Sequence, residues 1–201
     1  FVKIIVKKIL FFSNNKNKKK EINNMFKNLN LDILNLEDFK KIKEPIENAS
    51  SFEENAKIKS KYGFRAFSLP CFADDSGICI SALNNLPGIK SKRFIDENGG
   101  IKNTFKLIFK NISQRSDNKA YFKTSISLTI NEKNTLFFNG VVGGEITEKP
   151  RGENGFGYDP IFVPDGYNKT FAEMTSKEKN NVSHRFIAIN KLKNYLLNSF
   201  S

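Results

Sequence analysis

The chain of 201 residues has no tryptophan, one histidine and two cysteines. Cys71 and Cys79 match no zinc-ligand spacing and are too few for a disulfide framework, so we expect small core residues in a reducing compartment. The sequence also lacks an apolar run of the about 18 residues that a membrane helix needs. We therefore expect a cytoplasmic protein with no membrane partner, in which residues 1–7 form an N-terminal extension.

Acidic residues are scarce relative to basic ones, with 21 Asp and Glu against 33 Lys and Arg, a formal net charge of +12. Two explanations remain open. A genome rich in A and T encodes many Lys, Asn, Ile and Phe residues, and a basic protein also suits an anionic partner such as a nucleotide or a nucleic acid. Because the lysines are spread along the chain, we expect no stable nucleic-acid partner.

Short apolar runs alternate with stretches of helical periodicity, which predicts an α/β fold in one domain, residues 1–201. The predicted strands cover 9–12, 31–36, 69–73, 78–80, 121–130 and 135–142. The predicted helices cover 16–29, 52–62, 101–109 and 183–197. Capping boxes at 51–54 and 175–178 mark two helix starts.

A polar turn lies between the first predicted strand and the first predicted helix. Its residues are Ser13, Asn14, Asn15, Lys16, Asn17 and Lys18. Backbone N–H groups at a helix N-terminus bind anions, so the turn is a candidate phosphate site, and Lys18 adds positive charge. Taken alone, the stretch is explained more simply as an ordinary turn in a protein rich in Lys and Asn. It is not a P-loop, because the Gly-rich pattern that ends in Gly-Lys-Ser/Thr is absent.

Two adjacent carboxylates, Asp74 and Asp75, follow the apolar run 69–73. Neighbouring side chains in a strand point to opposite faces, so the two acids should have different roles unless the strand has ended. Ser76 and Gly77 favour a turn at this point. The pair either caps that turn or helps to hold a cation such as Mg²⁺, which takes one or two carboxylates plus substrate phosphates.

The loop over residues 150–160 is rich in glycine and carries Phe156, whose ring offers a stacking surface. Close backbone approach to a flat ligand explains this composition better than a mobile surface loop does. Downstream, His184 is followed by Arg185, and both side chains offer donors suited to keto oxygens or ring nitrogens. A lone histidine also occurs often as a core residue.

These stretches together resemble the inosine triphosphate pyrophosphatase family over about Lys8 to Lys193. The motifs that carry the resemblance are S-x-N-x-x-K-x-x-E (Ser13 to Glu21), F-E-E-N-A (Phe52–Ala56), A-D-D-S-G (Ala73–Gly77), L-P-G (Leu86–Gly88), R-G-E-N-G-F-G-Y-D-P (Arg151–Pro160), F-A-E-M (Phe171–Met174) and S-H-R (Ser183–Arg185). Any one motif is weak, but their order and spacing are specific.

The resemblance implies a mixed twisted central sheet flanked by helices, with two lobes and the active-site cleft between them. It implies a homodimer that uses Mg²⁺ to hydrolyse ITP, dITP or XTP to the monophosphate and pyrophosphate. Asp75 would be the general base or a metal ligand, and Asp74 and Glu47 would help to hold Mg²⁺. The implied substrate contacts are the 13–18 turn, Lys59, Ser76, Phe156, Gly157, Tyr158, Asp159, Lys179, His184 and Arg185, with Lys59 and Lys179 on phosphates.

The sequence departs from the family pattern at three places. Asn17 stands where glycine is common, and asparagine tolerates left-handed backbone. Of a common pair of acids only Glu47 remains, with Glu44 as a possible substitute, and Lys90 replaces a common tyrosine. A pyrophosphatase for modified pyrimidine nucleotides, a phosphatase releasing only the terminal phosphate, a nucleic-acid-binding module and an inactive relative remain as alternatives.

Overall fold

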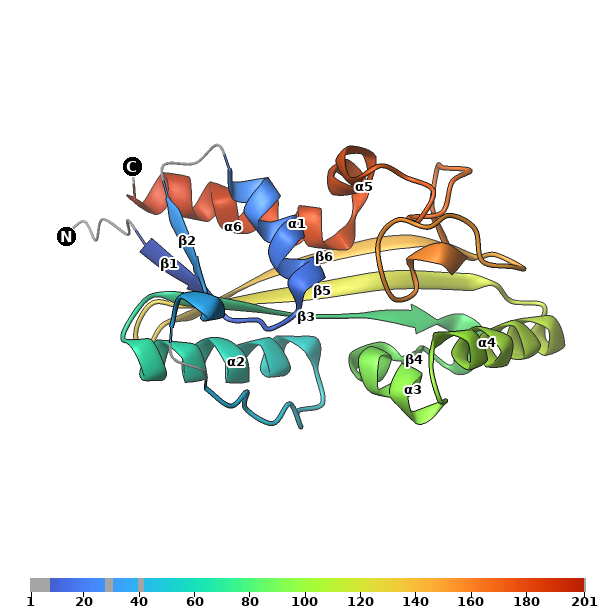
Figure 1. Ribbon diagram of the computed structural model, residues 1–201, viewed down its shortest axis with the longest axis horizontal. Helices are drawn as coiled ribbons and strands as arrows, with labels where there is room; N and C mark the ends of the chain where they lie inside the picture. The colour runs from blue at the N-terminus through green and yellow to red at the C-terminus, as the bar shows by residue number, and fades with distance from the viewer. Residues whose placement is uncertain (1–7, 28–30, 40–41, 201) are drawn as a thin grey trace. The chain divides into compact units, whose positions relative to one another are not determined.

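The computed structural model describes residues 8–27, 31–39 and 42–200, so the expected extension at 1–7 lies outside the described residues. The strands are β1 (Lys8–Phe11), β2 (Asp32–Asn35), β3 (Cys71–Ile80), β4 (Leu86–Pro87), β5 (Lys119–Thr129), β6 (Thr135–Ile146) and β7 (Phe162–Pro164). The α-helices are α1 (Lys16–Phe26), α2 (Phe52–Phe67), α3 (Ser91–Glu97), α4 (Ile101–Arg115), α5 (Ser176–Val182) and α6 (His184–Phe200) (Figure 1). The predicted α/β class is confirmed.

The strands form one mixed sheet in the order β2-β1-β3-β5-β6-β7, with β4 paired to β3. β1 is parallel to β2 and to β3, whereas β3–β4 and β6–β7 are antiparallel pairs. β5 and β6 follow each other through the short turn 130–134, as expected for a hairpin. Parallel and antiparallel pairing in one sheet confirms the expected mixed architecture.

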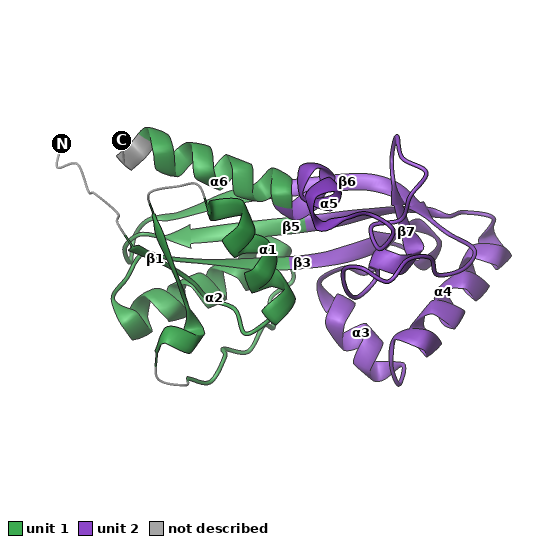
Figure 2. Ribbon diagram, turned by 45° about the horizontal axis from the view of Figure 1, so that its top comes forward, with its two compact units in different colours: residues 1–75, 124–139, 186–201 green, residues 76–123, 140–185 purple. Residues whose placement is uncertain are grey.

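The chain divides into two compact units (Figure 2). Unit 1 comprises residues 1–75, 124–139 and 186–201, and unit 2 comprises residues 76–123 and 140–185. In unit 1, α2 covers one face of the strands, and α1 and α6 cover the other (Figure 1). The side chains of β1 alternate between these two faces. Ile9 and Phe11 pack with residues of α1 and α6, whereas Leu10 packs on the other face with residues of α2 such as Phe64.

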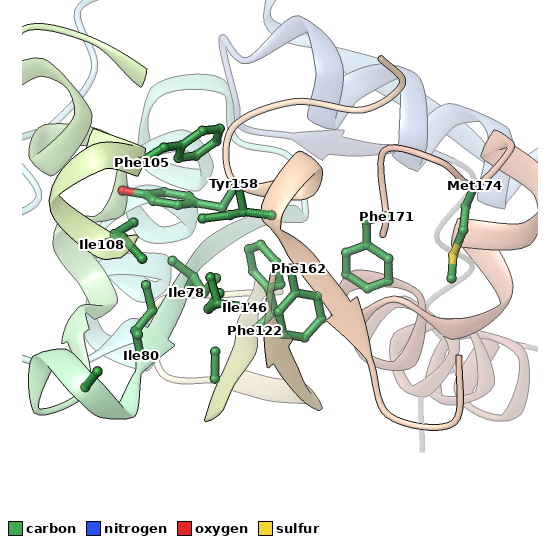
Figure 3. Close-up of a cluster of buried hydrophobic side chains, with 13 residues drawn as sticks. Ile78, Ile80, Phe105, Ile108, Phe122, Ile146, Tyr158, Phe162, Phe171 and Met174 are labelled. Atoms are coloured by element: carbon green, nitrogen blue, oxygen red, sulfur yellow. The ribbon is translucent and has the colours of Figure 1, made fainter. Parts of the chain in front are cut away.

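Unit 2 has a hydrophobic core of its own, rich in aromatic rings (Figure 3). Phe122 of β5 meets Phe162 of β7 edge to face, with 4.8 Å between the ring centroids. Tyr158 is buried in the same core, and its hydroxyl donates a hydrogen bond of 2.8 Å to the backbone carbonyl of Ser91. Burial raises the pKa of this tyrosine above its ordinary value.

The prediction of two short strands around the acidic pair is wrong, because β3 runs without interruption from Cys71 to Ile80. Gly77 lies inside this strand and forms no turn. Its lack of a side chain lets residues 88–91 pack closely against the strand. A Cβ at this position would lie 2.1 Å from the carbonyl oxygen of Gly88 and 2.6 Å from Ser91 Oγ. The next residue, Ile78, donates its N–H to the same Ser91 Oγ at 2.9 Å. The glycine therefore lets the strand lie against residues 88–91.

Candidate active site

The turn between β1 and α1 is built by asparagine side chains. Asn15 is the N-cap of α1, and its Oδ1 accepts the backbone N–H groups of Asn17 at 3.0 Å and Lys18 at 3.1 Å. Asn14, Asn15, Lys16 and Asn17 are exposed. With lysines and no acid in the first helical turn, the electrostatics of this helix start favour an anion.

A carboxylate already contacts this turn. Glu44 Oε1 accepts the backbone N–H of Asn14 at 3.1 Å, and Ser13 Oγ accepts that of Asn15 at 3.2 Å. The backbone N–H of Asn14 in the predicted phosphate turn is thus able to hold an oxygen anion. Glu44, the possible substitute for the missing acid, therefore lies at this turn.

The two acids of the A-D-D-S-G motif meet different helices. Asp74 Oδ2 lies 2.9 Å from Lys18 Nζ of α1, and Asp75 Oδ2 accepts a hydrogen bond of 3.1 Å from Asn55 Nδ2 of α2. Because β3 is continuous, its pleat sends the neighbouring side chains to opposite faces, where α1 and α2 lie. The expected difference in role between Asp74 and Asp75 has this structural basis.

Asp75 is buried within a group of charged and polar residues of unit 1. Lys59 Nζ lies 4.0 Å from Asp75 Oδ1 and 2.8 Å from Glu47 Oε2. Burial raises the pKa of the Asp75 carboxyl above its ordinary value, although attraction to Lys59 and Lys18 acts in the opposite direction. Burial acts to lower the pKa of Lys59, but attraction to Asp75 and to two further carboxylates outweighs it, and this pKa is raised.

The chemistry of this group fits a divalent cation held by two carboxylates. Glu47 and Asp75 both face the ammonium of Lys59, so both are oriented toward a positive charge. Mg²⁺ takes one or two protein carboxylates and completes its shell with water and phosphate oxygens. Asp74 is directed to Lys18, and the described residues contain no group of three or more His, Cys, Asp or Glu able to hold a metal ion.

The glycine-rich loop of unit 2 is organised by Asp159. This buried carboxylate accepts the backbone N–H of Phe156 at 2.8 Å and lies 2.7 Å from Lys179 Nζ. Gly155 has φ +74°, and a Cβ there would lie 2.1 Å from Asp159 Oδ2. The expected phosphate contact of Lys179 stays a prediction, since its ammonium pairs with Asp159 at this distance.

Phe156 presents a half-exposed ring beside two buried cations. Lys179 Nζ lies 5.0 Å from its centroid, and Arg185 Cζ lies 5.8 Å from it, distances typical of cation–π contacts. Arg185 also donates a hydrogen bond of 3.2 Å from Nη2 to Ser76 Oγ. A flat ring with donors around it suits a planar, electron-rich ligand.

His184 is buried and lies at the start of α6. Its imidazole stacks on Phe122, with 4.7 Å between the ring centroids and 8° between the planes. The stack fixes the plane in which the imidazole nitrogens lie. In the neighbouring loop, Gly157 has φ +59°. The side chain of Tyr158 lies in the hydrophobic core, so a ligand would contact this residue through its backbone.

Sequence reasoning missed two residues that hold the candidate groups in place. Asn55 belongs to the F-E-E-N-A motif, contacts Asp75 and is buried. Its position three residues after Phe52, on the same face of the predicted helix, was the available signal. Phe122, the partner of His184, carried no signal beyond its place in an alternating strand.

Support for the glycine-rich loop comes from the F-A-E-M segment, where the Ala172 carbonyl accepts the N–H of Asn154 at 3.0 Å.

None of the helices in the described part of the chain has the length and apolar content needed to cross a membrane.

Comparison with known proteins gives matches over nearly the whole chain. The model of the Ham1 family matches residues 9–195. Proteins named dITP/XTP pyrophosphatase are 40% identical over 185 residues in Flavobacterium johnsoniae (92% of this chain, 95% of that protein) and 42% identical over 193 residues in Thermoanaerobacter pseudethanolicus (94% and 96%). The solved structure of a HAM1 protein from Coxiella burnetii has a TM-score of 0.87 at 35% identity, covering 95% of this chain and 98% of that one. The Staphylococcus aureus Ham1 protein has a TM-score of 0.85 at 35% identity, covering 96% and 99%.

Proposed function

Because this chain belongs to the Ham1 family, we propose that it hydrolyses abnormal purine nucleoside triphosphates, namely dITP, XTP and ITP, to the monophosphate and pyrophosphate. The resemblance predicted from the motifs is confirmed by the family match. The chain is accordingly a nucleoside triphosphate pyrophosphatase, a hydrolase acting on an acid anhydride. The observation in its own structure that best supports this reaction is the buried Asp75, oriented by Asn55 and close to Lys59.

In this proposal, water attacks the α-phosphorus and the bond to the bridging oxygen of the β-phosphate breaks, so pyrophosphate leaves. Asp75 accepts a proton from the attacking water, a role open to a carboxylate held in place by Asn55. Lys59 and Lys18 bring positive charge to the phosphate oxygens. The backbone N–H of Asn14, which holds Glu44 in the structure, would bind a phosphate oxygen in its place.

We assign Mg²⁺ to Glu47 and Asp75, where it would neutralise the charge that develops on the leaving pyrophosphate. Lys59 now faces both carboxylates, and its ammonium would turn toward the phosphates when Mg²⁺ is bound. Asp74 would hold Lys18 in place through Oδ2, and its help in holding Mg²⁺ stays a prediction.

Unit 2 would select the base. We assign stacking to Phe156 and hydrogen bonding to His184 and Arg185, with Ser76 and the backbone of Gly157 to Asp159 completing the contacts. Hypoxanthine and xanthine have a 6-keto acceptor where adenine has an amino donor. If adenine were bound instead, the buried donors at this edge would have no acceptor. The free-energy cost of these unpaired donors would lower kcat/KM for ATP by a large factor relative to ITP.

A substrate panel with Mg²⁺ tests the proposed reaction. We expect pyrophosphate release from ITP, dITP and XTP at rates far above those with ATP and GTP. Orthophosphate as the first product would favour a phosphatase that removes the terminal phosphate. A preference for modified pyrimidine triphosphates would favour the related pyrophosphatases, and tight, salt-sensitive binding without turnover would favour a nucleic-acid-binding module.

The family resemblance also supports a homodimer that acts on the nucleotide pool of the cytoplasm. Sedimentation equilibrium at several protein concentrations tests the dimer. A monomeric mass at every concentration would overturn that part of the proposal and would leave the assigned chemistry unaffected.

A further inference from the structure

Asn55 is a buried asparagine in the first turn of α2, with a relative exposed area of 1%. Both ends of its amide are used. Nδ2 donates to Asp75 Oδ2 at 3.1 Å, and Oδ1 accepts the backbone N–H of Ala49 at 3.0 Å. A primary amide has one donor end and one acceptor end, so these two contacts fix which way the group points.

The contact with Asp75 sets the rotation of its carboxylate. With Oδ2 held by Asn55, Oδ1 is the oxygen directed toward Lys59 and the cation position that Glu47 shares. A hydrogen bond donated to an ionised carboxylate also favours its charged form. Asn55 therefore acts on the orientation of the group that is proposed to take the proton from water.

The contact with Ala49 acts on a different segment. Residues 42–49 precede α2 without regular secondary structure, and they include Glu47, two positions before Ala49. A loop of this kind depends on specific contacts to hold a side chain at a defined position. Through Ala49 N–H, Asn55 ties the Glu47 loop to the helix whose next turn carries Lys59.

We propose that Asn55 is a positioning residue that couples Glu47 to Asp75, so that the two carboxylates meet one divalent cation; this inference rests on the proposed function. A simpler role would be to satisfy the buried N–H of Ala49, and that role makes no demand on metal affinity. Partners that orient metal ligands typically change metal affinity or activity by about 10–100-fold when they are removed. The two roles are therefore separable by experiment.

The test compares Asn55→Ala with Ser60→Ala. Ser60 lies on the same helix, is fully buried, and bonds the hydroxyls of Ser127 and Thr129 at 2.8 Å each, so its loss removes buried hydrogen bonds elsewhere. Mn²⁺ affinity is measured by electron paramagnetic resonance in the presence of α,β-methylene-ITP, beside steady-state kinetics with ITP and Mg²⁺. We expect Asn55→Ala to weaken Mn²⁺ binding and to lower kcat by about tenfold or more each. For Ser60→Ala we expect both within about twofold of the wild type, with a lower Tm.

Two further measurements keep the outcome decisive. Asn55→Asp preserves the side-chain shape and the acceptor for Ala49 but removes the donor to Asp75, so a wild-type kcat in this variant would overturn the proposal. In a Glu47→Gln background, Asn55→Ala should weaken Mn²⁺ binding by a smaller factor than it does in the wild-type background, since the effects of coupled residues are not additive. Equal losses in the two backgrounds, or equal behaviour of Asn55→Ala and Ser60→Ala, would also overturn it. A wild-type protein without turnover of any purine triphosphate would instead overturn the proposed function.

Discussion

Unit 1 and unit 2 carry candidate residues of different chemistry. In unit 1 they are charged groups that pair with one another, such as Lys18 with Asp74 and Lys59 with Glu47. In unit 2 buried cations surround a half-exposed ring, as Arg185 does at Phe156. Paired charges are able to exchange partners when phosphates and a metal arrive, whereas a ring with fixed donors discriminates between bases. Substitutions in unit 1 should therefore lower turnover, and substitutions in unit 2 should change substrate preference.

The largest effect is expected from Asp75→Asn. The amide is no longer able to accept a proton from water, and a positioned general base contributes about 10²–10⁴-fold to a rate. We expect kcat with ITP to fall by at least about 100-fold, with circular dichroism and Tm showing a folded protein. Asp74→Asn is the matched control, because it changes the adjacent acid that meets Lys18 on the other face of β3, and its loss of kcat should be smaller. Substantial residual activity in Asp75→Asn would remove the base and metal roles from this residue.

A change of preference with little change of fold is expected from His184→Ala. Losing a donor that we assign to the 6-keto group should reduce the preference for ITP over ATP by about 10–100-fold, the scale of one unpaired buried polar group. The ratio of kcat/KM for the two nucleotides is the measurement, with Tm beside it. A variant that keeps the full preference for ITP would show that His184 has only a core role.

A smaller change of the same kind is expected from Phe122→Leu, which removes the ring that stacks on His184. Aromatic pairs contribute about 0.5–1.5 kcal/mol beyond their buried area, so the preference for ITP should fall by about twofold to tenfold. Phe105→Leu is the control, since Phe105 lies in the same core and contacts Phe109 and Tyr158. If both variants lose the same preference, general loosening of the unit 2 core explains the effect.

The smallest effect concerns the start of α5, the helix that carries Lys179. Hydrogen bonds from the backbone N–H and the side chain of Thr175 lower the pKa of Glu178 to about 2. Because this pKa is below the ordinary value of 4.5, the capping contribution is fully present above about pH 4.5 and is lost as the pH falls toward 2. Thermal melts of wild type and Glu178→Ala should differ at pH 6, and the difference should shrink by pH 2.5. A difference that does not change with pH would contradict the assignment.

Periodicity and caps were sufficient to predict much of the fold. The α/β class follows from local patterns, and Thr175 and Glu178 form the predicted capping box. At the other predicted box Ser51 accepts the N–H of Glu54, while the Glu54 carboxylate contacts the Ser51 hydroxyl. The short elements β4, α3 and β7 were not predicted, because two to seven residues carry too little periodicity.

The residues of the candidate site could be proposed from the sequence, but most of the contacts between them could not. Strand alternation correctly indicated that Asp74 and Asp75 have different surroundings, since that rule is local, whereas their different roles stay a prediction. The pairing of Lys179 with Asp159 and the stack of His184 on Phe122 join segments that are distant in sequence, and many partners would have satisfied the same composition. In the sequence Asn55 stands out only as part of the F-E-E-N-A motif, because its contacts depend on where Ala49 and Asp75 lie in space.

The pleat of β3 has a consequence for how this protein tolerates change. Deleting one residue just before Asp74 would leave the letters A-D-D-S-G nearly intact, yet it would exchange the faces of the two acids, so that the lysine of each helix would meet the wrong carboxylate. A substitution at a neighbouring position alters one contact, whereas a change of length alters every contact beyond it. In this strand, the number of residues is therefore under stricter constraint than the identity of most of them.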